Sequence, residues 1–179
     1  TAIEFNIEGN PFAGPEDNGY PGFMALVASV KPHQCTLVPD DPVQLTSDHG
    51  WDLTGESNQL KPVVEQLKDD KIRISCFMDP DHEQLTLAQH LGTHRIEFYT
   101  GPFAEHYGTP QGDEILQQFI AAGEHASSLG LGINAGHDLN QENLATFCRE
   151  VPNVVEVSIG HAIITDALWI GLGETVSRY

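Results

Sequence analysis

Basic side chains are scarce in this sequence. Only 8 of its 179 residues are Lys or Arg, against 26 Asp or Glu, so the formal net charge at pH 7 is −18. Proteins that bind the phosphate backbone of nucleic acids, or an anionic membrane surface, present clustered cations. We therefore expect neither nucleic acid nor a membrane as a partner. Small phosphorylated ligands remain compatible with this charge, because a few local hydrogen-bond donors can override the overall field.

Long apolar runs are also missing. Hydrophobic residues make up 40% of the chain, but no run approaches the ~20 residues of a membrane span. Residues 1–8 have the alternation of a strand rather than the apolar core of a signal peptide. The three cysteines, Cys35, Cys76 and Cys148, are odd in number and show no Cys-x-x-Cys spacing. We expect buried free thiols in a cytoplasmic protein, because the cytoplasm is reducing.

What the sequence does contain is a regular alternation of strand-like and helix-like segments. The strand-like segments lie at 3–8, 34–38, 72–78 and 95–99 and within 131–140 and 154–161. The helix-like segments lie at 21–30, 57–68, 81–91, 113–128, 141–150 and 162–177, and a loop of about a dozen residues is expected after the fourth strand. Strict alternation predicts a parallel sheet with right-handed crossovers, and the length predicts a single domain over residues 1–179.

Two architectures accommodate this alternation, an open doubly wound sheet and a barrel. A dinucleotide-binding doubly wound sheet carries Gly-x-Gly-x-x-Gly after its first strand, and Gly9, Gly136 and Gly160 do not form that motif. Polar residues instead follow many of the strands, as they do in a barrel whose site is built at the carboxyl ends of all its strands. We predict an α/β fold of the TIM (β/α)8 type, of which this chain supplies about six strand–helix units.

Two consecutive strands end in Gly-His. Gly136-His137 follows a short buried strand and precedes a helix cap, and Gly160-His161 follows the next strand and precedes a helix without a capping side chain. Histidine is the side chain best suited to exchange protons near neutral pH. The free N–H groups at the start of a helix make an anion site. We expect His137 to act in proton transfer and Gly160-His161 to bind phosphate; a tight structural turn is the alternative.

Two glutamates are predicted to point to the inner side of the barrel. Glu8 ends the first strand, and Glu97 lies within the fourth strand between two apolar residues. A partly desolvated carboxylate has a raised pKa, which suits a general acid or base. The alternative for both is a structural carboxylate. His82, His90 and His94 lie on or after one helix without metal-ligand spacing, so we expect a solvated surface there and no metal site.

Taken together, these motifs resemble the pyridoxine 5′-phosphate synthase family. The matching stretches follow the family's order and spread over nearly the whole chain. They are Asn6-Ile-Glu-Gly9, Lys31-Pro-His-Gln-Cys-Thr-Leu-Val-Pro39, Gln44-Leu-Thr46, Gly50-Trp-Asp-Leu53, Ile96-Glu-Phe-Tyr-Thr-Gly101, Ser128-Leu-Gly-Leu-Gly-Ile-Asn-Ala-Gly-His137 and Ser158-Ile-Gly-His-Ala-Ile-Ile164.

The resemblance implies a reaction and an assembly. The family condenses 1-deoxy-D-xylulose 5-phosphate with 3-amino-2-oxopropyl phosphate, without a cofactor, to give pyridoxine 5′-phosphate, phosphate and water. Its members are homo-oligomers, and the resemblance implies an octamer. By motif match, Glu8 takes a proton-acceptor position and His137 the proton-donor position, with Glu97 as a further catalytic candidate.

The resemblance also implies how substrate is bound. Thr46 matches a substrate-binding threonine, and Gly160-His161 matches the phosphate-binding pair. Asp138 follows the catalytic histidine where other members have glycine, so we expect it to contact substrate through its backbone.

One part of the family's pattern has no counterpart in this sequence. The family's first two strands carry an Asn-x-Asp-His motif and a His-x-Arg loop, which supply another catalytic histidine and the arginines for a second phosphate. We therefore expect the last six units of an N-terminally incomplete barrel. Two alternatives stay open, a non-catalytic remnant with one phosphate pocket and a different barrel enzyme that acts on a small phosphorylated ketose.

Overall fold

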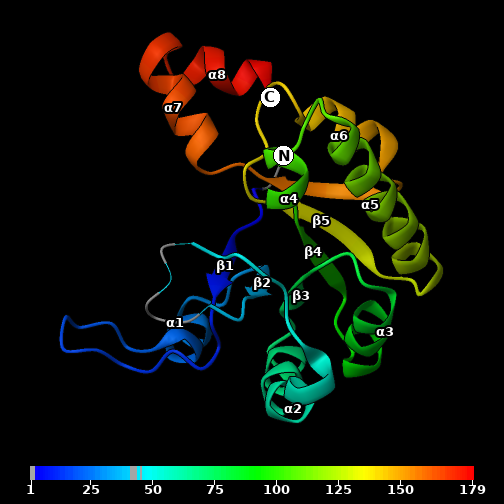
Figure 1. The fold of residues 1–179 in the computed structure, drawn as a ribbon. Coiled ribbons are helices and arrows are strands. Elements are labelled where there is room, and N and C mark those ends of the chain that lie inside the picture. The colour runs from blue at the N-terminus through cyan, green and yellow to red at the C-terminus, as the bar shows by residue number, and fades with distance from the viewer. Residues whose placement is uncertain (1–2, 41–43, 45) are drawn as a thin grey trace.

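The computed structural model describes residues 3–40, 44 and 46–179, and six strands within them form one sheet. The strands are β1 (Asn6–Gly9), β2 (Gln34–Leu37), β3 (Arg73–Met78), β4 (Arg95–Tyr99), β5 (Gly132–Gly136) and β6 (Val154–Ser158). Each strand pairs in parallel with the next along the chain, and the sheet curls instead of lying flat (Figure 1). A doubly wound sheet reverses its strand order at a switch point. The sequential order excludes that alternative and confirms the predicted parallel sheet.

Helices connect the strands, and most of them cover the outer side of the curl (Figure 1). They are α1 (Phe23–Val30), α2 (Leu53–Asp69), α3 (His82–Leu91), α4 (Gly101–Glu105), α5 (Pro110–Ser128), α6 (Leu144–Glu150), α7 (His161–Ile170) and α8 (Leu172–Arg178). Helices α7 and α8 stand apart at one end of the molecule (Figure 1). Within α7 no side chain is buried.

The hydrophobic core lies between the strands and the outer helices. Every second residue of β4 points outward, so Ile96 and Phe98 are fully buried there. Phe98 meets Phe119 of α5 edge to face with ring centroids 5.4 Å apart, and Phe119 packs in the same way on Phe147 of α6 at 5.3 Å. This aromatic contact anchors the helices behind β4, β5 and β6, so the alternate residues of these strands face the concave side.

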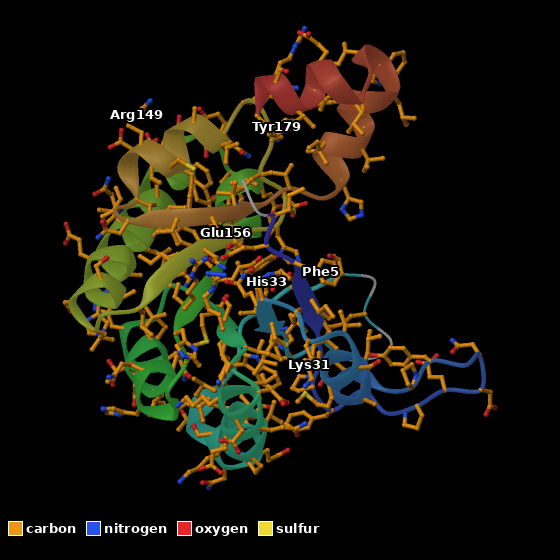
Figure 2. The ribbon with its side chains drawn as sticks, turned by 180° about the vertical axis from the view of Figure 1, so that it is seen from behind. Phe5, Lys31, His33, Arg149, Glu156 and Tyr179 are labelled. Carbon is orange, nitrogen blue, oxygen red and sulfur yellow. The ribbon has the colours of Figure 1, made fainter. Side chains whose placement is uncertain are left out.

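A polar network crosses the concave side near the amino ends of the strands. Arg95 binds Glu156 of β6 at 2.7 Å, and the other oxygen of Glu156 accepts a 2.9 Å hydrogen bond from Gln34 of β2. Gln34 in turn accepts from Nε of Arg73 at 3.0 Å. Figure 2, which views the molecule from behind, labels Glu156 beneath the last strand. The network ties β6 to β2 and occupies two of the chain's few cations far from the carboxyl ends of the strands.

Several predicted boundaries were wrong. The first strand begins at Asn6 instead of Ile3, because the N–H of Phe5 is bound by the Nδ1 atom of His33 rather than by a strand partner (Figure 2). The expected loop after β4 contains α4, which begins with Pro102 in its first turn, a favourable position for proline. The expected helix over 162–177 is two helices, since Gly171 adopts φ 82°, ψ 146°, a conformation outside any helix.

The cysteines are free, as expected, but they are not all buried. Cys35 and Cys76 are fully buried in β2 and β3, and Cys148 on α6 is exposed. Burial raises the pKa of the Cys35 and Cys76 thiols to about 12, so both stay protonated and unreactive.

The helices of the described residues all fall short of a membrane span, either in length or in apolar character.

Candidate active site

A cavity of about 1380 Å³ opens at the carboxyl ends of the strands. The predicted site residues that line it come from β1, the loop after β2, the turn after β5 and the start of α7; they are Glu8, Thr46, His137, Asp138, Gly160 and His161. Glu97 of β4 does not line the cavity and lies fully buried beneath it. The structure therefore brings the predicted residues together at one end of the sheet, although they span most of the sequence.

Glu8 lies next to the last residue of β1 and lines the cavity. Its side chain is exposed to solvent there. Desolvation, followed by the negative charge of Asp40, raises the pKa of Glu8 to about 7. Near neutral pH, Glu8 can both accept and release a proton.

Glu97 stands on the inner face of β4 and is fully buried. Burial raises its pKa above the ordinary carboxyl range, and the nearby charge of Glu8 raises it further. Its Oε2 atom lies 3.5 Å from the hydroxyl of Thr36, and among the described residues its buried Oε1 atom has no hydrogen-bond partner. The negative charge of Glu8 thus favours the protonated form of Glu97.

His137 occupies the turn between β5 and α6. Its ring packs against Phe77, with centroids 4.7 Å apart, and against the edge of Tyr99 at 5.6 Å. This partial burial lowers the pKa of His137, although the carboxylates of Asp138 and Asp40 oppose the shift. The lowered pKa favours the neutral form of the imidazole near pH 7. It stands between two aromatic walls and faces the cavity.

Gly160 and His161 begin α7 at the opposite wall. No side chain caps this helix, and the first backbone bond within it, from Ile164 N–H to Gly160 C=O, is 3.5 Å long. A Cβ added at Gly160 would meet no atom within 4 Å, so the backbone here is open to an approaching ligand. The helix has ten residues, and its free N–H groups carry a partial positive charge. This wall fits an anion without requiring Lys or Arg.

Three residues that matter at the site had no role in our sequence predictions. Tyr99 lines the cavity beside His137, and burial raises its pKa. Asp40 lies near both Glu8 and His137, and Ser47 holds its carboxylate through a 2.9 Å hydrogen bond. Alternation along β4 puts Tyr99 on the same face as Glu97, but nothing local marks Asp40, which follows Pro39 in a polar loop. The third residue, Thr100, follows β4 and is fully buried.

Thr46 and Asp138 lie on exposed parts of the cavity wall. Asp138 has a positive φ of 59°, and its carbonyl oxygen accepts from Asn143 Nδ2 at 3.3 Å. In the described residues, no group of three or more His, Cys, Asp or Glu side chains has an arrangement that could hold a metal ion. His82, His90 and His94 are exposed, as expected for surface residues.

The whole chain matches one protein family. The family model described as pyridoxal phosphate biosynthesis protein PdxJ matches residues 1–179. The chain belongs to the PdxJ family. The resemblance that the motifs carry is thus confirmed over the full length of the sequence.

Curated relatives of this PdxJ family chain are about half identical to it. A pyridoxine 5′-phosphate synthase of Xanthomonas oryzae pv. oryzae (strain MAFF 311018) is 50% identical over 178 residues, which cover 99% of this chain and 69% of that protein. A pyridoxine 5′-phosphate synthase of Xylella fastidiosa (strain 9a5c) is 49% identical over 177 residues, which cover 99% of this chain and 68% of that protein.

Solved structures with similar folds are distant in sequence. A xylose isomerase domain protein from Planctomyces limnophilus has a TM-score of 0.56 at 14% identity, and the match covers 98% of this chain and 69% of that one. A D-psicose 3-epimerase has a TM-score of 0.53 at 15% identity, covering 91% of this chain and 69% of that one. These likenesses concern the fold alone. They agree with an α/β chain of six parallel strands in a partial barrel.

Proposed function

We propose that this chain carries the activity of a pyridoxine 5′-phosphate synthase. The reaction joins 1-deoxy-D-xylulose 5-phosphate and 3-amino-2-oxopropyl phosphate into pyridoxine 5′-phosphate and releases phosphate and water. The family match and the names of the curated relatives support this proposal. The structural observation that carries it is the convergence of Glu8, His137 and the start of α7 on one cavity.

The two substrates can react only if protons move between carbon, nitrogen and oxygen atoms. Glu8 is suited to remove a proton, because its raised pKa gives it useful basicity near pH 7. The lowered pKa of His137 favours its neutral form. The negative charge of bound phosphate raises the pKa of a nearby imidazole, so substrate binding converts His137 into the proton donor. Glu97 lies beneath the cavity without lining it, so we propose that it acts through Glu8, whose charge raises the pKa of Glu97.

The phosphate of one substrate is proposed to bind at Gly160 and His161. Backbone N–H groups at the start of α7 can donate to its oxygens, and the helix dipole favours its charge. Thr46 and Asp138, which also line the cavity, are proposed substrate contacts, with Asp138 acting through its backbone. A substrate held in this way lies within the cavity that Glu8 and His137 both line.

We further propose that the complete fold is a (β/α)8 barrel, in which two more strand–helix units lie between β6 and β1. In the described residues β1 and β6 each pair with one strand only. Apolar side chains stand exposed beside both of these edges, with Phe5 54% and Val155 59% accessible to solvent. Additional strands would pair with both edges and cover these side chains.

The proposal is tested by supplying the native protein with both substrates. Pyridoxine 5′-phosphate should appear together with inorganic phosphate in a one-to-one ratio, as measured by chromatography and a phosphate assay. His137→Asn, assayed in parallel, should lose turnover. Absence of product from a well-folded parent protein, under conditions in which a curated relative is active, would refute the proposal. Retained phosphate binding without turnover would then favour the non-catalytic alternative.

The alternative of a different barrel enzyme for a phosphorylated ketose is not favoured, because the whole chain matches the PdxJ family. Following the same resemblance, we propose that the protein is a homo-oligomer, for which the family implies an octamer. Light scattering on the native protein measures its assembly mass and tests this directly.

A further inference from the structure

The backbone around the proposed catalytic histidine is in an unusual conformation. His137 has φ 79° and Asp138 has φ 59°, so two consecutive residues other than glycine adopt left-handed conformations. Such conformations are strained and persist only where the surrounding structure holds them. A nearby residue, Asn143, binds the carbonyl group of Asp138. The carbonyl groups of Gly136 and His137 are bound from another part of the fold.

Thr100 supplies those contacts from the end of the neighbouring strand. It follows β4 and is fully buried, and its N–H donates to Gly136 C=O at 2.9 Å. Its hydroxyl lies 2.6 Å from the carbonyl oxygen of Gly136 and 2.5 Å from that of His137. One side chain thus binds the peptide groups on both sides of His137. Asn143 binds the next carbonyl group, that of Asp138, at 3.3 Å.

Within the part of the chain that the structure describes, the hydroxyl of Thr100 makes only these two hydrogen bonds. Thr100 precedes α4 as its N-cap residue, where threonine hydroxyls commonly bind the first N–H groups of the helix. Here no side-chain cap bond forms, and Thr100 contributes only its carbonyl group, which accepts from Ala104 N–H at 3.0 Å. The hydroxyl is directed away from its own helix, toward the turn that carries His137.

We propose that Thr100 is a positioning residue for His137, whose hydroxyl holds the left-handed turn that directs the imidazole into the cavity. This inference rests on the proposed function, in which His137 transfers a proton. The ring contacts of Phe77 and Tyr99 limit how the imidazole rotates, but the direction of its Cα–Cβ bond is set by the backbone. If the turn relaxed toward negative φ, that bond would point elsewhere and the ring would leave its place between the two aromatic side chains.

The test compares Thr100→Val, which keeps the shape of the side chain but lacks the hydroxyl, with Thr100→Ser, which keeps the hydroxyl. Thr93→Val is the matched control, because Thr93 is also buried, lies at the other end of β4, and donates its hydroxyl to Ala88 C=O at 3.1 Å. Each protein is assayed for kcat and KM. The imidazole C–H signal of His137, assigned with His137→Asn, is followed by NMR as the pH is changed.

A catalytic group displaced by about 1 Å can lose on the order of 10²-fold in rate. We expect Thr100→Val to lower kcat by about that factor while KM changes little, and to shift the chemical shift and titration midpoint of His137. Thr100→Ser and Thr93→Val should behave like the parent protein in all these measurements. If Thr100→Val does not fold, as judged by circular dichroism, Thr100→Ala replaces it with the same expectations.

Three outcomes would overturn the proposal. These are a kcat of Thr100→Val close to that of the parent, an unchanged His137 signal in that variant, and an equal loss in Thr93→Val. The NMR comparison does not require turnover. If the parent protein lacked synthase activity, the proposed function would fail, and the His137 signal in Thr100→Val and Thr100→Ser would still decide whether Thr100 holds the turn.

Discussion

The carboxyl group of Glu97 lies so close to Gly136 that it leaves no room for a side chain at position 136. A Cβ atom added at Gly136 would stand 2.4 Å from Oε1 of Glu97 and 3.1 Å from Cβ of Ser158. The two residues are cross-strand neighbours on β4 and β5, where Glu97 pairs with Asn134 and Tyr99 with Gly136. The glycine before His137 therefore makes room for a buried carboxyl group, in addition to ending its strand.

Replacement of Gly136 should disturb the site by displacing Glu97, which lies beneath the cavity. We expect Gly136→Ala to lower the free energy of unfolding by about 1–3 kcal/mol, as overpacking in a core does, and to lower kcat because Glu97 must move. Urea unfolding and the synthase assay measure the two effects. Gly55→Ala is the control, since a Cβ there meets no atom within 4 Å in helix α2. Equal stability of both variants would contradict the expected clash.

The buried carboxyl group should make stability fall as the pH rises. Burial raises the pKa of Glu97 in the folded protein above the value of about 4.3 that a glutamate has when unfolded. Below both pKa values Glu97 is protonated in the folded and in the unfolded protein, so its ionisation does not change the free energy of unfolding. Between them only the unfolded chain releases its proton, so the free energy of unfolding decreases as the pH increases and levels off above the folded-state pKa.

Glu97→Gln removes this dependence. The stability of the variant relative to the parent should therefore be greater at pH 8 than at pH 5. Urea unfolding at the two pH values measures the difference, and Glu65→Gln on the exposed surface of α2 serves as the control. A gain that was larger at pH 5 than at pH 8 would show that Glu97 is not protonated preferentially in the folded state.

Two substitutions in the cavity wall should affect proton transfer and phosphate binding separately. His137→Asn should lower kcat by about 10²–10⁴-fold, as expected for a general acid or base, and should leave product affinity nearly unchanged. Gly160→Val should mainly weaken product binding, because its side chain would occupy the open space from which phosphate approaches α7. Turnover assays and calorimetry with pyridoxine 5′-phosphate measure the two properties. Near-normal turnover in His137→Asn would remove His137 from the proposed mechanism.

The two kinds of ion pair in this chain should differ in their contribution to stability. Arg95→Met leaves Glu156 on the concave side without its cation, and should cost about 1.5–3 kcal/mol, typical of hydrogen bonds to charged groups. Arg149→Met breaks an exposed pair with Glu150, and should change stability by about 0–1 kcal/mol. Urea unfolding of both variants at one pH provides the comparison. A larger loss in Arg149→Met would contradict it.

Features that depend on neighbouring residues in the sequence were predictable, whereas features that depend on distant residues were not. Alternation placed Ile96 and Phe98 outward and Glu97 inward, because that pattern is local to one strand. Strict strand–helix alternation predicted the parallel order of the sheet. The Gly-His pairs at two strand ends predicted that His137 and His161 would line one cavity. Their catalytic and binding roles remain predictions.

Other features depend on contacts between distant residues and had no local signal. The hydroxyl of Thr100 meets the turn at His137, 37 residues away. In a single sequence, a threonine at that position is indistinguishable from a helix cap. The break at Gly171 was also missed, since glycine is tolerated within helices and only its positive φ reveals the end of α7. Asp40 was overlooked because its effect is the electrostatic influence of a loop residue on Glu8.

The hydrogen bond between Gln34 and Glu156 joins residues separated by 122 positions. In the folded sheet β3, β4 and β5 lie between β2 and β6, so this bond crosses the concave side and requires the sheet to be curled. Contacts of such long sequence separation slow folding, because the loop must close before the contact stabilises anything. The Gln34–Glu156 bond should therefore be a late event, made when the nascent sheet acquires its curvature.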